Sequence, residues 1–158
     1  MPVKKLREFL DKEGVKYVVM SHSKAFTAPE VAASAHISGR EMAKTVMVKL
    51  DGHMVMVVLP ANHRIDFEVL LGETNAEAAD LASEAEFEDL FPGCEVGAMP
   101  PFGNLYGLKV WVEETLADSD MIAFNAGSHT EVIQLQFTDF EALVQPKLIS
   151  ALSNPATD

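Results

Sequence analysis

The fold of this protein is decided by the stretch Thr45-Val46-Met47-Val48-Lys49-Leu50-Asp51-Gly52-His53-Met54-Val55-Met56-Val57-Val58-Leu59. Its two halves are rich in valine and other residues typical of β-strands. Asp51 and Gly52 between them predict a two-residue hairpin turn, because such turns need positive φ angles that glycine adopts readily. The second half is almost continuously apolar, so we expect neighbours on both faces of that strand. Pro60 ends it.

On the N-terminal side of the hairpin, the sequence predicts a helix, a strand and a second, short helix. Apolar residues recur at helical spacing from Val3 onward, and Gly14 is a suitable stop for the first helix. The strand is expected over residues 15–20. The short helix follows Pro29 and has Thr27 near its N-cap.

On the C-terminal side, helical patterns return and alternate with short strands. One helix begins after Asp66, and two more begin at capping boxes formed by Ser83 with Glu86 and by Thr138 with Glu141. Short strands are predicted over residues 108–112, 121–124 and 132–135. Helices at both ends and in the middle, with hairpin-linked strands between them, indicate an α+β domain.

Length and composition restrict the class of protein. The 158 residues fit one domain, which we place at residues 1–149, followed by a polar tail at 150–158 that we expect to be frayed. The net charge of −12 argues against broad binding to DNA or other nucleic acids, but it is compatible with a small basic site. The single cysteine suits a reducing compartment. Without an apolar run of membrane-spanning length or a signal peptide, we expect a soluble, cytoplasmic protein.

One loop has the composition of a backbone that approaches a ligand closely. The glycine–proline loop, as we name residues 97–107, reads Gly97-Ala98-Met99-Pro100-Pro101-Phe102-Gly103-Asn104-Leu105-Tyr106-Gly107. Its small residues would let peptide N–H and C=O groups reach a bound molecule. A tight connector between a helix and a strand explains the same pattern equally well.

A second small-residue segment, residues 125–130, is named here the second turn. It contains Gly127, Ser128 and His129, and Glu131 follows directly. A hydroxyl, an imidazole and a carboxylate suggest a catalytic triad, but adjacent residues rarely form one. We favour a turn between strands whose hydroxyls bond to nearby backbone groups, and which still takes part in a pocket.

Lys44 stands at the start of the first hairpin strand. A lysine there is most often a solvated cap, but one that points into a concave sheet can hold a phosphate as a point charge. The five histidines show no metal-ligand spacing, so we expect no metal site. Cys94 has no sequence neighbour that would activate it as a nucleophile. The residues alone predict a pocket with one lysine, two glycine-rich segments and no evident side-chain nucleophile.

Five motifs, in this order, resemble the YbaK/prolyl-tRNA synthetase-associated editing domain family. They are Ala43-Lys44-Thr45, Val57-Val58-Leu59-Pro60-Ala61, Leu81-Ala82-Ser83-Glu84-Ala85-Glu86, Gly97-Ala98-Met99-Pro100-Pro101-Phe102-Gly103 and Phe124-Asn125-Ala126-Gly127-Ser128-His129-Thr130. The resemblance extends from about His22 to the last helix. It implies a compact, curved mixed β-sheet, similar to a partial barrel and flanked by helices.

The resemblance also implies roles for individual residues. Lys44 matches the functional lysine, which engages the terminal phosphate of the substrate. Gly97 and Pro101 match a Gly-x-x-x-Pro loop that positions the ester and a water molecule, and Gly127 matches the turn that lines the pocket. Substrate-binding roles are expected for four further residues, namely Thr27, Met99, Ser128 and His129.

The implied function is that of an enzyme, a trans-editing hydrolase. It would cleave the ester between a small, wrong amino acid and tRNA, in the first instance tRNA for proline, by direct attack of water and without metal or organic cofactor. Its partners would be the acceptor end of the mischarged tRNA and an aminoacyl-tRNA synthetase, with neither DNA nor a membrane involved. The alternative is a non-catalytic module that binds an aminoacyl- or adenosine-like ligand for regulation.

Overall fold

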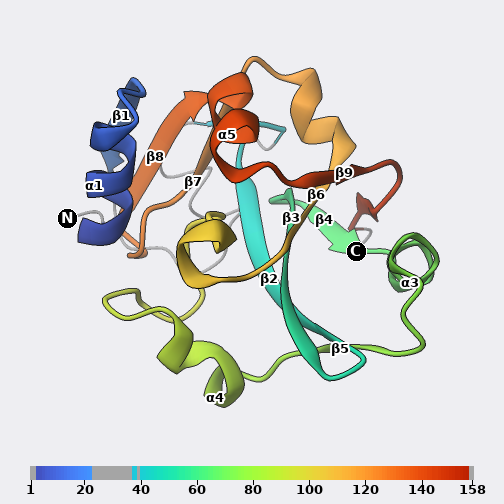
Figure 1. Ribbon diagram of the computed structural model, residues 1–158. Coiled ribbons are helices and arrows are strands. Elements are labelled where there is room, and N and C mark those ends of the chain that lie inside the picture. Colours follow the sequence, from blue (N-terminus) through green and yellow to red (C-terminus); the bar gives the residue numbers. More distant parts are fainter. Residues whose placement is uncertain (1–2, 23–36, 39, 157–158) are drawn as a thin grey trace.

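The computed structural model describes residues 3–22, 37–38 and 40–156 (Figure 1). The predicted hairpin lies at its centre, where β2 (Ala43–Leu50) pairs antiparallel with β3 (His53–Pro60). Its turn residues Asp51 and Gly52 have φ angles of 49° and 82°, the left-handed pair that a tight turn needs. Residues 55–60 of β3 are buried, which confirms that both faces of this strand are covered.

Six further strands extend the hairpin into one curved, open surface (Figure 1). They are β1 (Tyr17–Ser21), β5 (Ala79–Leu81), β6 (Val110–Glu113), β7 (Met121–Asn125), β8 (Glu131–Gln136) and β9 (Lys147–Ile149). One sheet has the order β5-β2-β3-β6-β9 and is mixed, because β3 and β6, and also β6 and β9, run parallel. The antiparallel sheet β1-β8-β7 meets it at a bridge between Met42 and Ala123. The predicted α+β class with a curved mixed sheet is confirmed.

Helices cover both faces of the surface. α1 (Lys4–Lys12), α4 (Glu84–Phe87) and α5 (Phe137–Val144) contribute to the main core on one face, and α3 (Phe67–Thr74) packs on the other. Within the main core, the ring of Phe102 packs against three others, with centroid distances of 6.2 Å to Phe9, 5.4 Å to Phe124 and 5.5 Å to Phe140. The glycine–proline loop is therefore anchored in the core by Phe102. None of the helices within the described residues has the length and apolarity to cross a membrane.

Two of the predicted helix starts are confirmed and one is wrong. Asp66 accepts hydrogen bonds at the start of α3, and Ser83 forms the predicted capping box of α4. Thr138, in contrast, lies inside α5, which begins at Phe137 and has no side-chain cap. The Phe137 ring is buried, and the backbone N–H of Phe137 donates to the carbonyl of Asp120. Together these contacts fix the start of the helix at Phe137. The helix expected after Pro29 lies outside the described residues.

The expectation of a frayed tail from residue 150 is also wrong. Leu152 is fully buried, and β10 (Ser153–Pro155) pairs antiparallel with β4 (His63–Ile65). The Oγ of Ser153 lies 3.1 Å from the Oε1 of Glu113, to which it donates, and 2.8 Å from the Nδ1 of His63. Since the hydroxyl proton is used on Glu113, the hydrogen-bond network assigns the Nδ1 proton to neutral His63. This polar chain ties the C-terminal strand to β6 and β4.

We expect His63 to make the folded protein less stable in acid. Burial lowers the pKa of His63 from its usual 6.5; the Glu113 carboxylate opposes this shift, and the positive charge of Lys44 adds to it. The unfolded chain then takes up a proton near pH 6.5, while the folded chain takes it up only at lower pH. The free energy of unfolding should therefore fall as pH drops from 6.5 towards the folded pKa, and the His63 contribution should then level off.

Thermal melts between about pH 7.5 and about pH 5, for wild type and His63→Gln, measure this contribution. Glutamine does not titrate, so the variant should lose less stability on acidification than the wild type. Parallel pH profiles for the two proteins would contradict the assignment.

Candidate functional site

The glycine–proline loop and the second turn lie against each other, although about 30 residues separate them in sequence. The N–H of Gly127 donates to the carbonyl of Ala98 at 2.9 Å, and the N–H of Glu95 donates to the carbonyl of Gly127 at 2.7 Å. Both bonds join backbone to backbone, so they fix the two segments relative to each other independently of side-chain rotamers. The structure therefore brings together Gly97, Gly127 and His129 from two separate motifs.

The buried His129 stabilises the contact between the glycine–proline loop and the second turn. The residue is 5% exposed, and its Nε2 lies 2.8 Å from the carbonyl oxygen of Val96. Because a carbonyl only accepts, Nε2 must carry the proton. The backbone N–H of His129 donates to the carboxylate of Glu95 at 3.2 Å. His129 thus holds the entry to the glycine–proline loop, which makes it a positioning residue for Gly97.

The conformations of the two glycines explain why these positions are glycine. Gly97 has a φ of +85° and Gly127 a φ of +99°, which other residues adopt only with strain of about 1–3 kcal/mol. At Gly127, an added Cβ would also lie 3.0 Å from the Cβ of Val3. In the described part of the chain, the N–H groups of Gly97 and Met99 make no hydrogen bond to a protein acceptor. The loop therefore holds two peptide donors in a fixed geometry.

The second turn does not form a catalytic triad. The hydroxyl of Ser128 lies 3.3 Å from the Oγ1 of Thr130 and 3.5 Å from the Oε1 of Glu131, while the Nε2 of His129 points to Val96 instead. Ser128 consequently has no hydrogen bond to the protonated nitrogen of the imidazole. The interpretation of these hydroxyls as local turn partners agrees with this geometry.

Lys44 occupies a separate environment on the same sheet. Its neighbours two and four residues along β2, Val46 and Val48, belong to the face covered by α3, and alternation along a strand places Lys44 on that face too. Burial lowers the pKa of its amine, and the positive charge of Arg64 lowers it further. Among the described residues, Lys44 makes no hydrogen bond or ion pair with either glycine segment.

The remaining predicted residues are distributed as follows. Pro101 is buried at the end of the Gly-x-x-x-Pro segment, next to Phe102 of the core. Met99 is 4% exposed and packs in the main core, so its described role is to support the loop. Its role as a substrate-binding side chain stays a prediction, and Thr27 lies outside the described residues.

Sequence reasoning missed Arg64 and the bracing carbonyl of Val96. Arg64 follows the hairpin closely in sequence, and the structure places it on β4, beside the cavity that Lys44 lines. Val96 acts through its backbone, which no residue pattern reveals. Cys94, considered as a nucleophile, is half-buried, and burial raises the pKa of its thiol.

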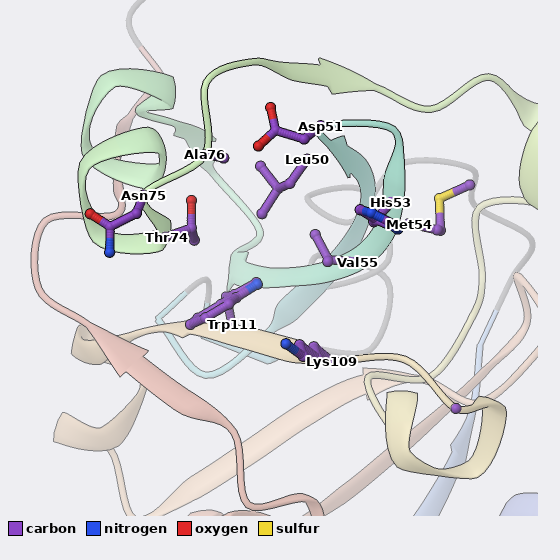
Figure 2. A pocket seen from close by; sticks show the side chains of 11 residues that line it. Leu50, Asp51, His53, Met54, Val55, Thr74, Asn75, Ala76, Lys109 and Trp111 are labelled. Carbon is purple, nitrogen blue, oxygen red and sulfur yellow. The ribbon is translucent and has the colours of Figure 1, made fainter.

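The residues described by the structure form no group of three His, Cys, Asp or Glu side chains that could hold a metal ion. A cavity of about 490 Å³ is lined by none of the predicted site residues that the structure describes. Figure 2 shows Trp111 of β6 and Lys109, which precedes that strand, opposite Asp51 at the hairpin turn, with the end of α3 on one side. Of the glycine–proline loop, only its last residue, Gly107, is among the described residues that line this cavity.

Comparison with known proteins identifies relatives of the whole chain. The family profile described as "Aminoacyl-tRNA editing domain" matches residues 22–143. The "Multifunctional Ser/Thr-tRNA deacylase ProXp-y" of Escherichia coli (strain K12) is 30% identical over 151 residues, which are 92% of this chain and 90% of that protein. A "Proline--tRNA ligase" of Bacillus mycoides (strain KBAB4) is 26% identical over 88 residues, which are 56% of this chain and 15% of the ligase.

Solved structures show the same fold at low sequence identity. A structure described as hypothetical protein APE2540 has a TM-score of 0.83 at 19% identity, over 96% of this chain and 100% of its own. A candidate trans-editing enzyme for prolyl tRNA synthetase has a TM-score of 0.79 at 17% identity, over 93% of this chain and 94% of its own.

The family profile and the deacylase relative place this chain in a class of hydrolases that act on the ester of aminoacyl-tRNA. The chain belongs to the aminoacyl-tRNA editing domain family, and its activity is aminoacyl-tRNA deacylation. This result confirms the resemblance found in the sequence.

Proposed function

We propose that this protein is a cytoplasmic trans-editing enzyme that removes a small, wrong amino acid from tRNA by direct attack of water. The observation that carries the mechanism is the rigid junction of the two glycine segments, which holds the N–H groups of Gly97 and Met99 without a protein acceptor among the described residues. Two fixed donors are suited to the negative charge that develops on an ester carbonyl oxygen during attack.

The mechanism assigns the reacting groups to backbone and substrate. Water attacks the ester carbonyl, the loop N–H groups stabilise the oxyanion, and the ribose oxygen leaves with the proton that the water gives up. Lys44 binds the phosphate of the terminal nucleotide. The phosphate and the ester of the terminal nucleotide lie on one ribose, so this mechanism requires Lys44 and the loop to engage the same nucleotide.

The identity of the amino acid and of the tRNA is proposed from chemistry and from the relatives. Editing is needed for small side chains, because the lack of one methylene changes binding by only about 1–3 kcal/mol. The relatives named as a Ser/Thr-tRNA deacylase and as proline–tRNA ligases support small amino acids on tRNA, with tRNA for proline among the candidates. The net charge of −12 favours contacts limited to the acceptor end, with a synthetase as the partner that delivers the tRNA.

The test is a deacylation assay with a panel of mischarged tRNAs. The panel contains tRNA for proline charged with alanine or cysteine, and tRNAs charged with serine or threonine; correctly charged prolyl-tRNA is the matched control. We expect at least one mischarged species to lose its amino acid faster than by spontaneous hydrolysis, with the same rate in EDTA, and prolyl-tRNA to persist. Inactivity on the whole panel would favour the non-catalytic binding module.

Two side chains that could act as nucleophiles are expected to be dispensable. Ser128→Ala and Cys94→Ala should each keep deacylation within about tenfold of wild type, the range for losing a neutral hydrogen bond. Initial rates on the best substrate of the panel measure this. A covalent aminoacyl adduct on either residue, or a folded but inactive Ser128→Ala protein, would replace attack by water with a protein nucleophile.

A further inference from the structure

A cavity of about 340 Å³ lies beside Lys44, on the face of β2 that α3 covers. It is lined by residues of β2, β3, β4, the start of α3 and the edge strand β5. Two of the described residues that line it are cations, Lys44 and Arg64, and the others are apolar: Val46, Leu59, Ile65, Phe67 and Leu81. None of these described residues is acidic.

The two cations share the cavity without a counter-ion from the described part of the chain. Neither Lys44 nor Arg64 forms an ion pair with any described residue. The nearest acidic residue in sequence, Asp66, is engaged elsewhere, because its carboxylate accepts from the N–H groups of Glu68 and Val69. Two like charges on one cavity of a chain with a net charge of −12 mark a site that a bound anion would stabilise.

One of the apolar residues that line the cavity is unusually exposed to solvent. Leu81 is 62% exposed on the edge strand β5, although it lines the cavity. Phe67 begins α3 and is half-buried on the opposite side. A flat apolar body could rest against these residues, and nucleobases combine such a body with a phosphate.

We propose that this cavity is the nucleotide subsite of the enzyme, in which Arg64 is a second phosphate-binding residue beside Lys44 and the wall with Leu81 and Phe67 contacts the base. The inference rests on the proposed function for its substrate, the nucleotide at the 3′ end of tRNA. It adds a residue and a base contact that the sequence motifs did not contain. Guanidinium groups bind phosphate in a bidentate manner, whereas an ammonium acts as a point charge, so the two cations have different tasks.

Binding is measured first, apart from catalysis. The probes are adenosine, adenosine 5′-monophosphate and a 5′-phosphorylated RNA oligonucleotide that ends in CCA. We expect Arg64→Ala to weaken binding of the oligonucleotide about tenfold to a hundredfold and to reduce the dependence of log Kd on log salt. Leu81→Ala, at an exposed position that folding tolerates, should weaken it severalfold. Lys109→Ala removes one positive charge from another cavity and should change neither quantity.

The probes also distinguish the source of the nucleotide. Preference for the oligonucleotide over the monophosphate supports an RNA end, and equal affinity for both supports a free nucleotide in the same subsite. Equal affinity of the wild type for adenosine and its monophosphate overturns the proposal. Equal affinity of Arg64→Ala and Lys109→Ala for the oligonucleotide overturns it too.

Kinetics separates phosphate binding from a structural effect. Arg64→Ala should raise KM for mischarged tRNA more than it lowers kcat, and should leave hydrolysis of 3′-O-aminoacyl-adenosine, which lacks the phosphate, unchanged. Equal loss on both substrates would overturn the proposal. Failure of the wild type to deacylate anything, together with Arg64-dependent binding, would contradict the proposed function but not the nucleotide subsite.

Discussion

A Gly97→Val protein is expected to fold and to lose about 10²–10³-fold of its deacylase turnover, the loss typical of removing one oxyanion donor. Gly97 has a φ of +85°, which a β-branched residue cannot adopt without strain. The space is not the obstacle, because an added Cβ would meet the ring of His129 only at an ordinary 3.6 Å. The backbone must therefore rotate, and the N–H groups of the loop turn away from the ester.

The control for this variant is Gly14→Val. Gly14 also has a left-handed φ, +68°, with nothing within 4 Å of an added Cβ, but it lies at the end of α1. Both variants should lose about 1–3 kcal/mol of stability, and only Gly97→Val should lose turnover. Turnover is compared at saturating substrate, alongside a thermal melt of each protein. Equal activity of the two variants would contradict catalysis by the loop backbone.

A Lys44→Met protein is expected to lose about 10²-fold in kcat/KM while keeping its stability. The loss corresponds to one charge-assisted contact with phosphate. Burial and the charge of Arg64 both lower the pKa of Lys44, so the folded protein holds this charge at a cost. Methionine keeps the apolar stem without the charge, and the melting temperature should stay equal or rise. Deacylation at low substrate concentration, with a melt at the same pH, measures both effects.

Lys49→Met is the matched control on the same strand. Lys49 lies on the opposite face of β2, where it pairs with Glu86, and this pair lowers the pKa of the Glu86 carboxyl to about 2. The substitution removes an exposed ion pair and should leave deacylation unchanged. If Lys44→Met were folded and as active as Lys49→Met, the assignment of the phosphate to Lys44 would be wrong.

Local sequence patterns predicted the elements that are determined by residues close together in the sequence. The Asp51-Gly52 turn, the strands on each side of it and the helix starts at Asp66 and Ser83 depend on residues a few positions apart, and all are confirmed. Thr138 shows the limit of such patterns. Its capping-box spacing is matched in sequence and would start the helix at residue 139, but the helix begins two residues earlier, at the buried Phe137.

For the candidate site, the sequence by itself determined the residue types: a lysine entering a strand and two small-residue segments in an order that identifies the family. Only the tertiary structure decided how they are arranged. The hydrogen bonds from Gly127 to Ala98 and from His129 to Val96 use backbone carbonyls. Every residue has such a carbonyl, so no sequence pattern shows which ones will be used. Arg64 lies beside the cavity of Lys44 on β4, a strand that pairs with β10, about 90 positions away in sequence. Long-range pairings depend on the packing of the whole chain, so no local spacing could predict them.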